Sequence, residues 1–222
     1  MQYTLSGRTV EIFSTADGIA PLVILNTIQG EGEKIFDKCL EIGGKNFTLA
    51  AISNLNWNRD LSPWETPEIR NNRHGFGGAD EYISELIASI LPAVLAELPA
   101  EPEYTAIAGY SLAGLFALYA AYKTDVFSRI ASVSGSLWFP RFTEFVQSHD
   151  FAKTPDCIYL SLGDAEAKTR DKNLAPVQKN TEFLAELYKS RGIPRIFELN
   201  SGNHFTDPAG RTAKGIMKII EN

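Results

Sequence analysis

The sequence predicts a doubly wound α/β fold with a mostly parallel sheet and helices on both faces. Two observations lead to it. Short apolar runs without strict alternation are typical of parallel strands that are covered on both faces, and segments of helical period lie between several of them. The runs span residues 21–26, 47–52, 104–108, 129–133, 157–162 and 195–199. Since no linker or repeat interrupts the 222 residues, we expect one domain over 1–222.

The remaining elements follow from local patterns. Residues 8–13 alternate between apolar and polar side chains and predict an edge strand near the start of the chain. Residues 80–98 carry a broad apolar stripe at helical spacing, with Asp80 as the expected N-cap and Pro92 as the expected kink. Two further helices are predicted at residues 175–191 and 208–220.

Composition excludes several classes of function. The net charge of −6 without a Lys/Arg cluster argues against a nucleic-acid partner. Residues 1–5 do not resemble a secretion signal, and no apolar stretch reaches the length of a membrane span. Cys39 and Cys157 are too few and too far apart for a metal site or a disulfide framework. We therefore expect a cytoplasmic protein without a metal or membrane partner; the oligomeric state is not indicated.

The most informative motif is Gly-Tyr-Ser-Leu-Ala-Gly at residues 109–114. A strand-like run precedes it and a helical run follows it, which is the context of a nucleophile elbow, where a strained turn exposes a serine above the sheet. The usual pattern is G-x-S-x-G, and here Ala113 replaces the closing glycine. The motif predicts Ser111 as a nucleophile; the alternative is a turn that only joins a strand to a helix.

A nucleophilic serine needs a base to take its proton. Of the three histidines, His204 follows the last apolar run and so belongs at the sheet edge where the elbow lies. His74 precedes the elbow and is expected at a pocket rim or turn, and His149 at the end of a surface helix. His204 is the predicted base.

The carboxylate that orients the histidine should lie between the serine and the histidine in chain order, after the penultimate strand. Residues 163–168 offer two candidates, Glu166, which we prefer, and Asp164. Asp171 and Asp207 are more distant candidates, and a loop carboxylate is commonly only solvated. The choice between Glu166 and Asp164 stays open.

Acyl transfer also needs donors for the oxygen that becomes negative. The backbone N–H of Leu112 follows the nucleophile at a helix N-terminus, where the helix dipole assists. A second donor is expected in the loop at residues 26–30, at Ile28. These two groups form the predicted oxyanion hole.

With the serine, acid and histidine loops in this order, the chain resembles the Putative esterase family of α/β-hydrolases. That family includes enterochelin and related siderophore esterases, formylglutathione hydrolases, feruloyl esterases and mycolyl transferases. The resemblance covers nearly the whole chain and is carried by residues 58–64, 77–80, 109–116, 134–138, 159–166 and 202–205. It implies an α/β-hydrolase fold with no large cap domain.

The resemblance also implies residue roles. It implies Ser111 as nucleophile and His204 as base, and it places Arg59 and Trp138 near the acyl or aryl pocket. There a guanidinium would bind an anionic or catechol group and an indole would stack on a ring. Pairing of Arg59 with Asp60, and packing of Trp138 on the following helix, are the alternatives. Where many members carry His-Gly before the oxyanion residue, residues 26–27 are Asn-Thr.

The sequence therefore predicts a serine esterase that works through a Ser-His-acid triad and an acyl-enzyme, without a cofactor. Its partner would be a small-molecule ester, of siderophore type or another aryl or acyl ester. An acyltransferase with the same triad is one alternative. A catalytically silent binding protein of the hydrolase fold is the other, because a fold does not fix a function.

Overall fold

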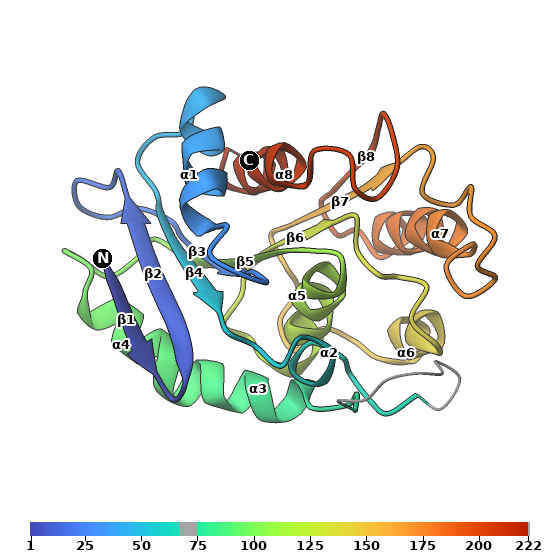
Figure 1. Ribbon diagram of the computed structural model, residues 1–222, viewed down its shortest axis with the longest axis horizontal. Coiled ribbons are helices and arrows are strands. Elements are labelled where there is room, and N and C mark those ends of the chain that lie inside the picture. Colours follow the sequence, from blue (N-terminus) through green and yellow to red (C-terminus); the bar gives the residue numbers. More distant parts are fainter. Residues whose placement is uncertain (67–74, 222) are drawn as a thin grey trace.

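The computed structural model describes residues 1–66 and 75–221, and its centre is an eight-stranded sheet (Figure 1). The strands lie in the order β1-β2-β4-β3-β5-β6-β7-β8. β1 and β4 pair antiparallel with β2, and all the other pairs are parallel. The strands are β1 (Gln2–Leu5), β2 (Arg8–Ser14), β3 (Leu22–Asn26), β4 (Thr48–Ser53), β5 (Thr105–Tyr110), β6 (Arg129–Val133), β7 (Cys157–Gly163) and β8 (Arg195–Asn200).

Helices cover both faces of this sheet. α1 and α8 lie on one face, and the longer helical path from α3 to α4 lies with α5, α6 and α7 on the other (Figure 1). The helices are α1 (Gly32–Glu41), α2 (Trp57–Asp60), α3 (Ala79–Glu85), the π-helical turn η1 (Leu86–Ile90), α4 (Leu91–Ala96), α5 (Leu112–Lys123), α6 (Phe142–Ser148), α7 (Val177–Ser190) and α8 (Pro208–Ile220). The predicted doubly wound, mostly parallel α/β fold class is confirmed.

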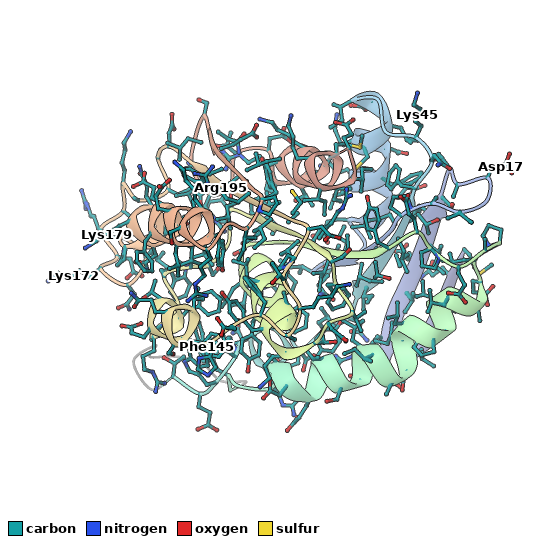
Figure 2. All side chains as sticks on the ribbon, turned by 180° about the vertical axis from the view of Figure 1, so that it is seen from behind. Asp17, Lys45, Phe145, Lys172, Lys179 and Arg195 are labelled. Carbon is teal, nitrogen blue, oxygen red and sulfur yellow. The ribbon has the colours of Figure 1, made fainter. Side chains whose placement is uncertain are left out.

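Alternation along the strands divides the core into two layers. In β3, Val23 and Leu25 face α1 and α8, whereas Leu22 and Ile24 face the other helices, and all four are fully buried. α5 is apolar around its whole circumference because it is buried along nearly its whole length. α7 has an outer face instead, and Figure 2 shows its Lys179 pointing away from the sheet.

The two ends of the sheet differ from the sequence prediction. The strand expected at an edge is β2, which lies between β1 and β4, and β1 forms the edge instead. β8 is the other edge, and its side chains are only partly covered, with Leu199 48% exposed. A run of apolar residues in the sequence therefore does not distinguish a central parallel strand from a half-covered edge strand.

The helix expected at 80–98 also differs in detail. It begins at Ala79 after Gly78, so Asp80 is not its N-cap. The Asp80 carboxylate instead accepts hydrogen bonds from the Tyr119 hydroxyl at 2.7 Å and the Lys123 ammonium at 3.0 Å. Just before Pro92 the chain winds through the π-helical turn η1. A π-helical turn is one known site of helix distortion, and here the helix continues past it into α4.

Two other sequence expectations can be compared with the described residues. Cys39 and Cys157 are both buried and free. Within residues 1–66 and 75–221, no helix is long and apolar enough to cross a membrane. The helix α1, for which the sequence analysis makes no prediction, begins without a side-chain cap from Glu31.

Candidate active site

The turn between β5 and α5 holds Ser111 in an unusual backbone conformation. Its φ is 60° and its ψ is −122°, a region that non-glycine residues seldom occupy. The strand and helix approach closely at this turn, since a Cβ at Gly109 would collide with the backbone of Ala113. Ala113 itself lies in the first turn of α5 and has no positive φ, so alanine fits where the usual pattern has glycine.

The structure brings Ser111, His204 and Glu166 into one hydrogen-bonded chain. His204 Nε2 lies 3.0 Å from Ser111 Oγ, and His204 Nδ1 lies 2.7 Å from Glu166 Oε2. The serine follows β5, the glutamate follows β7 and the histidine follows β8. Because these strands are parallel, their carboxyl ends share one edge of the sheet, and residues separated by 93 positions meet there.

The Glu166 carboxylate lies in a dense set of donors. Besides His204, it accepts hydrogen bonds on Oε1 from Gly163 N at 2.6 Å, Ser134 Oγ at 2.8 Å and Arg211 Nη1 at 3.2 Å. Its side chain is only 3% exposed. Burial alone would raise its pKa, but the hydrogen bonds from His204, Gly163 and Ser134 outweigh burial and hold the pKa below its ordinary value. Glu166 is therefore held as a carboxylate.

The other predicted acids bind backbone groups elsewhere. Asp164 is exposed and accepts a hydrogen bond from Gly202 N at 2.9 Å. Asp171 accepts one from Asn173 N at 2.8 Å, and Asp207 accepts one from Gly210 N at 3.1 Å as the N-cap of α8. Of the two carboxylates left open by the sequence, Glu166 contacts His204. Asp164 instead binds Gly202 N, in the loop that carries His204.

The other two histidines do not join this chain of contacts. His149 ends α6, where its ring stacks on Phe145 with centroids 4.2 Å apart. His74 lies outside the described residues. The structure therefore gives Ser111 one histidine neighbour within the described part of the chain, His204.

Sequence reasoning missed three residues that hold the acid and the histidine in place. Arg211 of α8 is 5% exposed, and its Nη2 donates to Ser201 O at 2.8 Å while its Nη1 also donates to Asn203 O at 3.1 Å. Tyr110 donates its hydroxyl to His204 O at 2.5 Å. Ser134, with a φ of 45°, donates to Glu166. For Arg211 the sequence does contain a signal: an arginine stands among small residues on the inner face of the last helix.

The two predicted oxyanion donors come from different elements. Leu112 is the first residue of α5, where a backbone N–H has no acceptor within the helix. Ile28 lies in the loop after β3, is 55% exposed and lines the cavity beside Ser111. The loop is anchored by Thr27 N, which donates to Ile52 O at 2.8 Å, and by the Tyr82 hydroxyl, which donates to Asn26 Oδ1 at 2.6 Å.

A cavity of about 380 Å³ opens beside Ser111 and His204. Its walls come from the end of β3 and the following loop, from α1, from the elbow, and from the start of α8. Neither Arg59 nor Trp138 is among its described lining residues, and Trp57 of α2 is there instead. Arg59 pairs with Asp60 at 3.2 Å and with Glu81, and Trp138 packs near Phe139. The substrate contacts implied for these two residues are thus not found at this cavity.

The described residues also bear on metal binding. No group of three or more His, Cys, Asp or Glu side chains that could hold a metal ion occurs between residues 1 and 66 or 75 and 221. The charged side chains at the cavity, apart from His204, are Glu31 and Lys34.

Comparisons with known proteins give the family and the fold of the chain. The model of the family described as Putative esterase matches residues 45–207. A protein of Bacillus subtilis (strain 168), the uncharacterized protein YbbA, is 23% identical over 193 residues, 82% of this chain and 76% of its own. An IroE-like serine hydrolase from Shewanella oneidensis has a similar fold, with a TM-score of 0.80, 18% identity, and coverage of 96% of this chain and 76% of its own. The siderophore hydrolase EstA from Aspergillus nidulans superimposes with a TM-score of 0.76, 19% identity, and coverage of 100% and 93%.

Proposed function

Because the chain belongs to the Putative esterase family, we propose that it is a serine carboxylic-ester hydrolase with Ser111, His204 and Glu166 as its triad. The observation that carries the proposal is the unbroken contact chain from Ser111 Oγ through both ring nitrogens of His204 to Glu166. The three contacting side chains have the roles that acyl transfer requires: a nucleophile, a base and a group that orients the base. Fold similarity alone would not support an activity.

In the proposed reaction, Ser111 Oγ attacks the ester carbonyl carbon while its proton passes to His204 Nε2. The negative charge that develops on the carbonyl oxygen is stabilised by the backbone N–H groups of Leu112 and Ile28. Collapse of this intermediate breaks the bond to the alcohol oxygen, which takes the proton from His204. A water molecule, deprotonated by His204, then attacks the acyl carbon. The bond to Ser111 Oγ breaks, the acid is released, and His204 returns the proton to Ser111 Oγ.

Glu166 has two tasks in this scheme. Its hydrogen bond to Nδ1 fixes the tautomer and orientation of His204, so that the unprotonated Nε2 faces the serine. Its negative charge stabilises the imidazolium that forms during attack. Since the hydrogen bonds around Glu166 lower its pKa, the carboxylate keeps this charge at neutral pH.

A serine-directed phosphonate probe and 4-nitrophenyl esters test the proposal together. We expect the probe to label wild type at Ser111, and we expect Ser111→Ala to lose both the label and ester turnover. Ser136→Ala is the matched control, because Ser136 Oγ lies only 3.4 Å from Ser111 Oγ, and this variant should keep the label.

Three results would contradict the proposal in different ways. Wild type that is neither labelled nor active would leave a binding protein of the hydrolase fold. Label at Ser136 would identify another nucleophile. Formation of a new ester in preference to free acid, when an acceptor alcohol is added, would identify an acyltransferase.

A further inference from the structure

The inner wall of the cavity beside Ser111 is apolar and buried. It is formed by Leu25 of β3, Ile35 of α1, and Ala209 and Thr212 of α8, whose exposed fractions are between 0% and 8%. These residues belong to the core layer between the sheet and the pair α1 and α8. On this side the cavity is thus bordered by residues of the hydrophobic core.

Most polar side-chain atoms beside this wall are hydrogen-bonded within the protein. Thr212 Oγ1 donates to Pro208 O at 2.8 Å, and Thr27 Oγ1 lies 3.4 Å from Ile52 O as its donor. Asn26 Oδ1 accepts from Tyr82, whereas Asn26 Nδ2 is buried without a hydrogen-bond partner among the described residues. Leu25, Ile35 and Ala209 present only methyl and methylene groups to a ligand, and a polar ligand group placed against them would lose its hydrogen bonds to water without replacement.

The charged side chains that line the cavity belong to its outer part. Glu31 is partly exposed and Lys34 is exposed, and both come from the start of α1. Two large apolar side chains accompany them, Ile28 at 55% and Phe205 at 84% exposure. Polar atoms of a bound ester are thus accommodated at the outer part, and apolar atoms at the inner wall.

The cavity volume indicates how much of a ligand the cavity can cover. A dry cavity of about 150 Å³ is enough to bind benzene, with its six carbons. The cavity here has about 380 Å³, which on the same scale holds on the order of fifteen non-hydrogen atoms. When the ester group occupies part of this volume, the rest of the cavity can hold about six to ten carbons of a flexible chain.

We propose that the site is specific for esters with an unbranched aliphatic chain of about six to ten carbons, which lies between α1 and α8 against the inner wall. This inference rests on the proposed function and names its substrate class. It sets the protein apart from an enzyme for catechol esters, because the side chains of Leu25, Ile35 and Ala209 offer catechol hydroxyls no hydrogen bond. The chain can belong to the acid or to the alcohol, and the shared chemistry is the alkyl group.

Three ester series test the proposal. One varies the acyl chain of 4-nitrophenyl esters from two to twelve carbons, one varies the alkyl alcohol of acetate esters over the same lengths, and one is a 2,3-dihydroxybenzoyl ester. We expect kcat/KM in at least one alkyl series to peak at six to ten carbons, at least tenfold above its shortest member. The catechol ester should be at least tenfold poorer than the best alkyl ester.

Variants of the inner wall make the test specific to this cavity. Ala209→Leu should shift the optimum to chains at least two carbons shorter, and Ile35→Ala should shift it to longer chains. Ile35→Val replaces Ile35→Ala if thermal unfolding shows that the larger truncation does not fold. Leu40→Ala, on the more exposed face of α1, is the matched control and should leave the profile unchanged.

The outcomes separate this inference from the proposed function. Turnover that is highest for the shortest esters in both series, preference for the catechol ester, or a profile that Ala209→Leu does not move would overturn the substrate class while leaving the esterase intact. Absence of all turnover, together with absence of probe label at Ser111, would overturn the proposed function instead.

Discussion

The two sides of the candidate site are built in different ways. On the acid side, Glu166 and His204 are held by hydrogen bonds to side chains and backbone groups from the end of β6, from β7, from α8 and from the elbow. On the substrate side, Ile28 and Phe205 are large apolar side chains that are 55% and 84% exposed. One side holds polar atoms by several hydrogen bonds, and the other presents exposed apolar surface.

This difference matches the demands of the proposed reaction. Proton transfer between Ser111 and His204 depends steeply on distance and direction, so the acid and base need several bonds each. The binding of an alkyl chain depends on the apolar area that it buries and has little directional preference. Its binding surface therefore needs a complementary shape more than it needs hydrogen bonds. The site thus combines a rigid reacting centre with a binding region of lower geometric precision.

Glu166→Gln replaces the carboxylate at the centre of the rigid side and has the largest expected effect. The amide cannot accept from all its present donors, and it supplies no negative charge to His204. We expect kcat to fall by about 10²–10⁴-fold, with KM little changed. Steady-state kinetics on 4-nitrophenyl esters measure this.

Asp164→Asn is the matched control, because Asp164 lies two residues away and contacts Gly202 N but not His204. We expect at most a tenfold loss there. If the two variants lost activity equally, the assignment of Glu166 as the orienting acid would be wrong.

Arg211→Met tests whether the rigid side depends on the buried guanidinium. The variant leaves Ser201 O and Asn203 O without this donor and removes the cation beside Glu166. We expect the free energy of unfolding to fall by about 3 kcal/mol, as for other broken buried pairs. Urea unfolding measures it, with Lys214→Met on the same helix as control. Lys214 is 43% exposed, and its pair with Glu198 should contribute no more than about 1 kcal/mol.

The pH dependence of stability tests the charge on Glu166. Its folded pKa lies below the ordinary value of 4.5, so the unfolded chain takes up the proton first as the pH falls. The stabilisation is therefore complete well above pH 4.5 and is lost as the pH falls through the lowered folded pKa. Glu166→Gln should be less stable than wild type by about 2 kcal/mol at pH 7, and the gap should narrow below pH 4.5. Thermal melts between pH 7 and pH 3 measure the gap, and a constant gap would contradict the prediction.

The same contrast explains how much could be predicted from the sequence. Buried parallel strands are recognisable as apolar runs, and their common edge brings the loops with Ser111 and His204 together. The choice between Glu166 and Asp164 could not be made, because it depends on which way two neighbouring side chains point from one turn. The roles of Ser111, His204 and Glu166 in catalysis stay predictions.

The substrate side was harder to predict for a physical reason. Arg59 and Trp138 were expected at the pocket from a resemblance, but Arg59 pairs with Asp60 and Glu81, and Trp138 packs near Phe139. Trp57, two residues before Arg59 in α2, lines the cavity instead. Apolar lining residues look like any core residue in a sequence, and only the packing of α1 against α8 shows which of them border a cavity.

Tyr110→Phe removes one bond of the rigid side without removing an apolar ring. Burial raises the pKa of Tyr110, so its hydroxyl remains a donor to His204 O throughout the working pH range. The lost hydrogen bond is expected to be worth about 1 kcal/mol. We expect kcat to fall by about threefold to tenfold with an unchanged KM, and a rise in KM alone would show that Tyr110 acts on the substrate instead.

Phe205→Ala probes the substrate side and has the smallest expected effect. The Phe205 ring meets the His204 ring edge-on, with centroids 5.4 Å apart, yet the side chain is 84% exposed. Removing exposed apolar surface should change the unfolding free energy by less than about 0.5 kcal/mol. We expect KM for a long-chain ester to rise by about threefold, since little apolar area is lost, with kcat unchanged. Tyr110 and Phe205 both contact His204. A fall in kcat for Phe205→Ala as large as that for Tyr110→Phe would therefore mean that Phe205 also orients the histidine. The division of the site into a rigid side and an apolar substrate side would then fail at this residue.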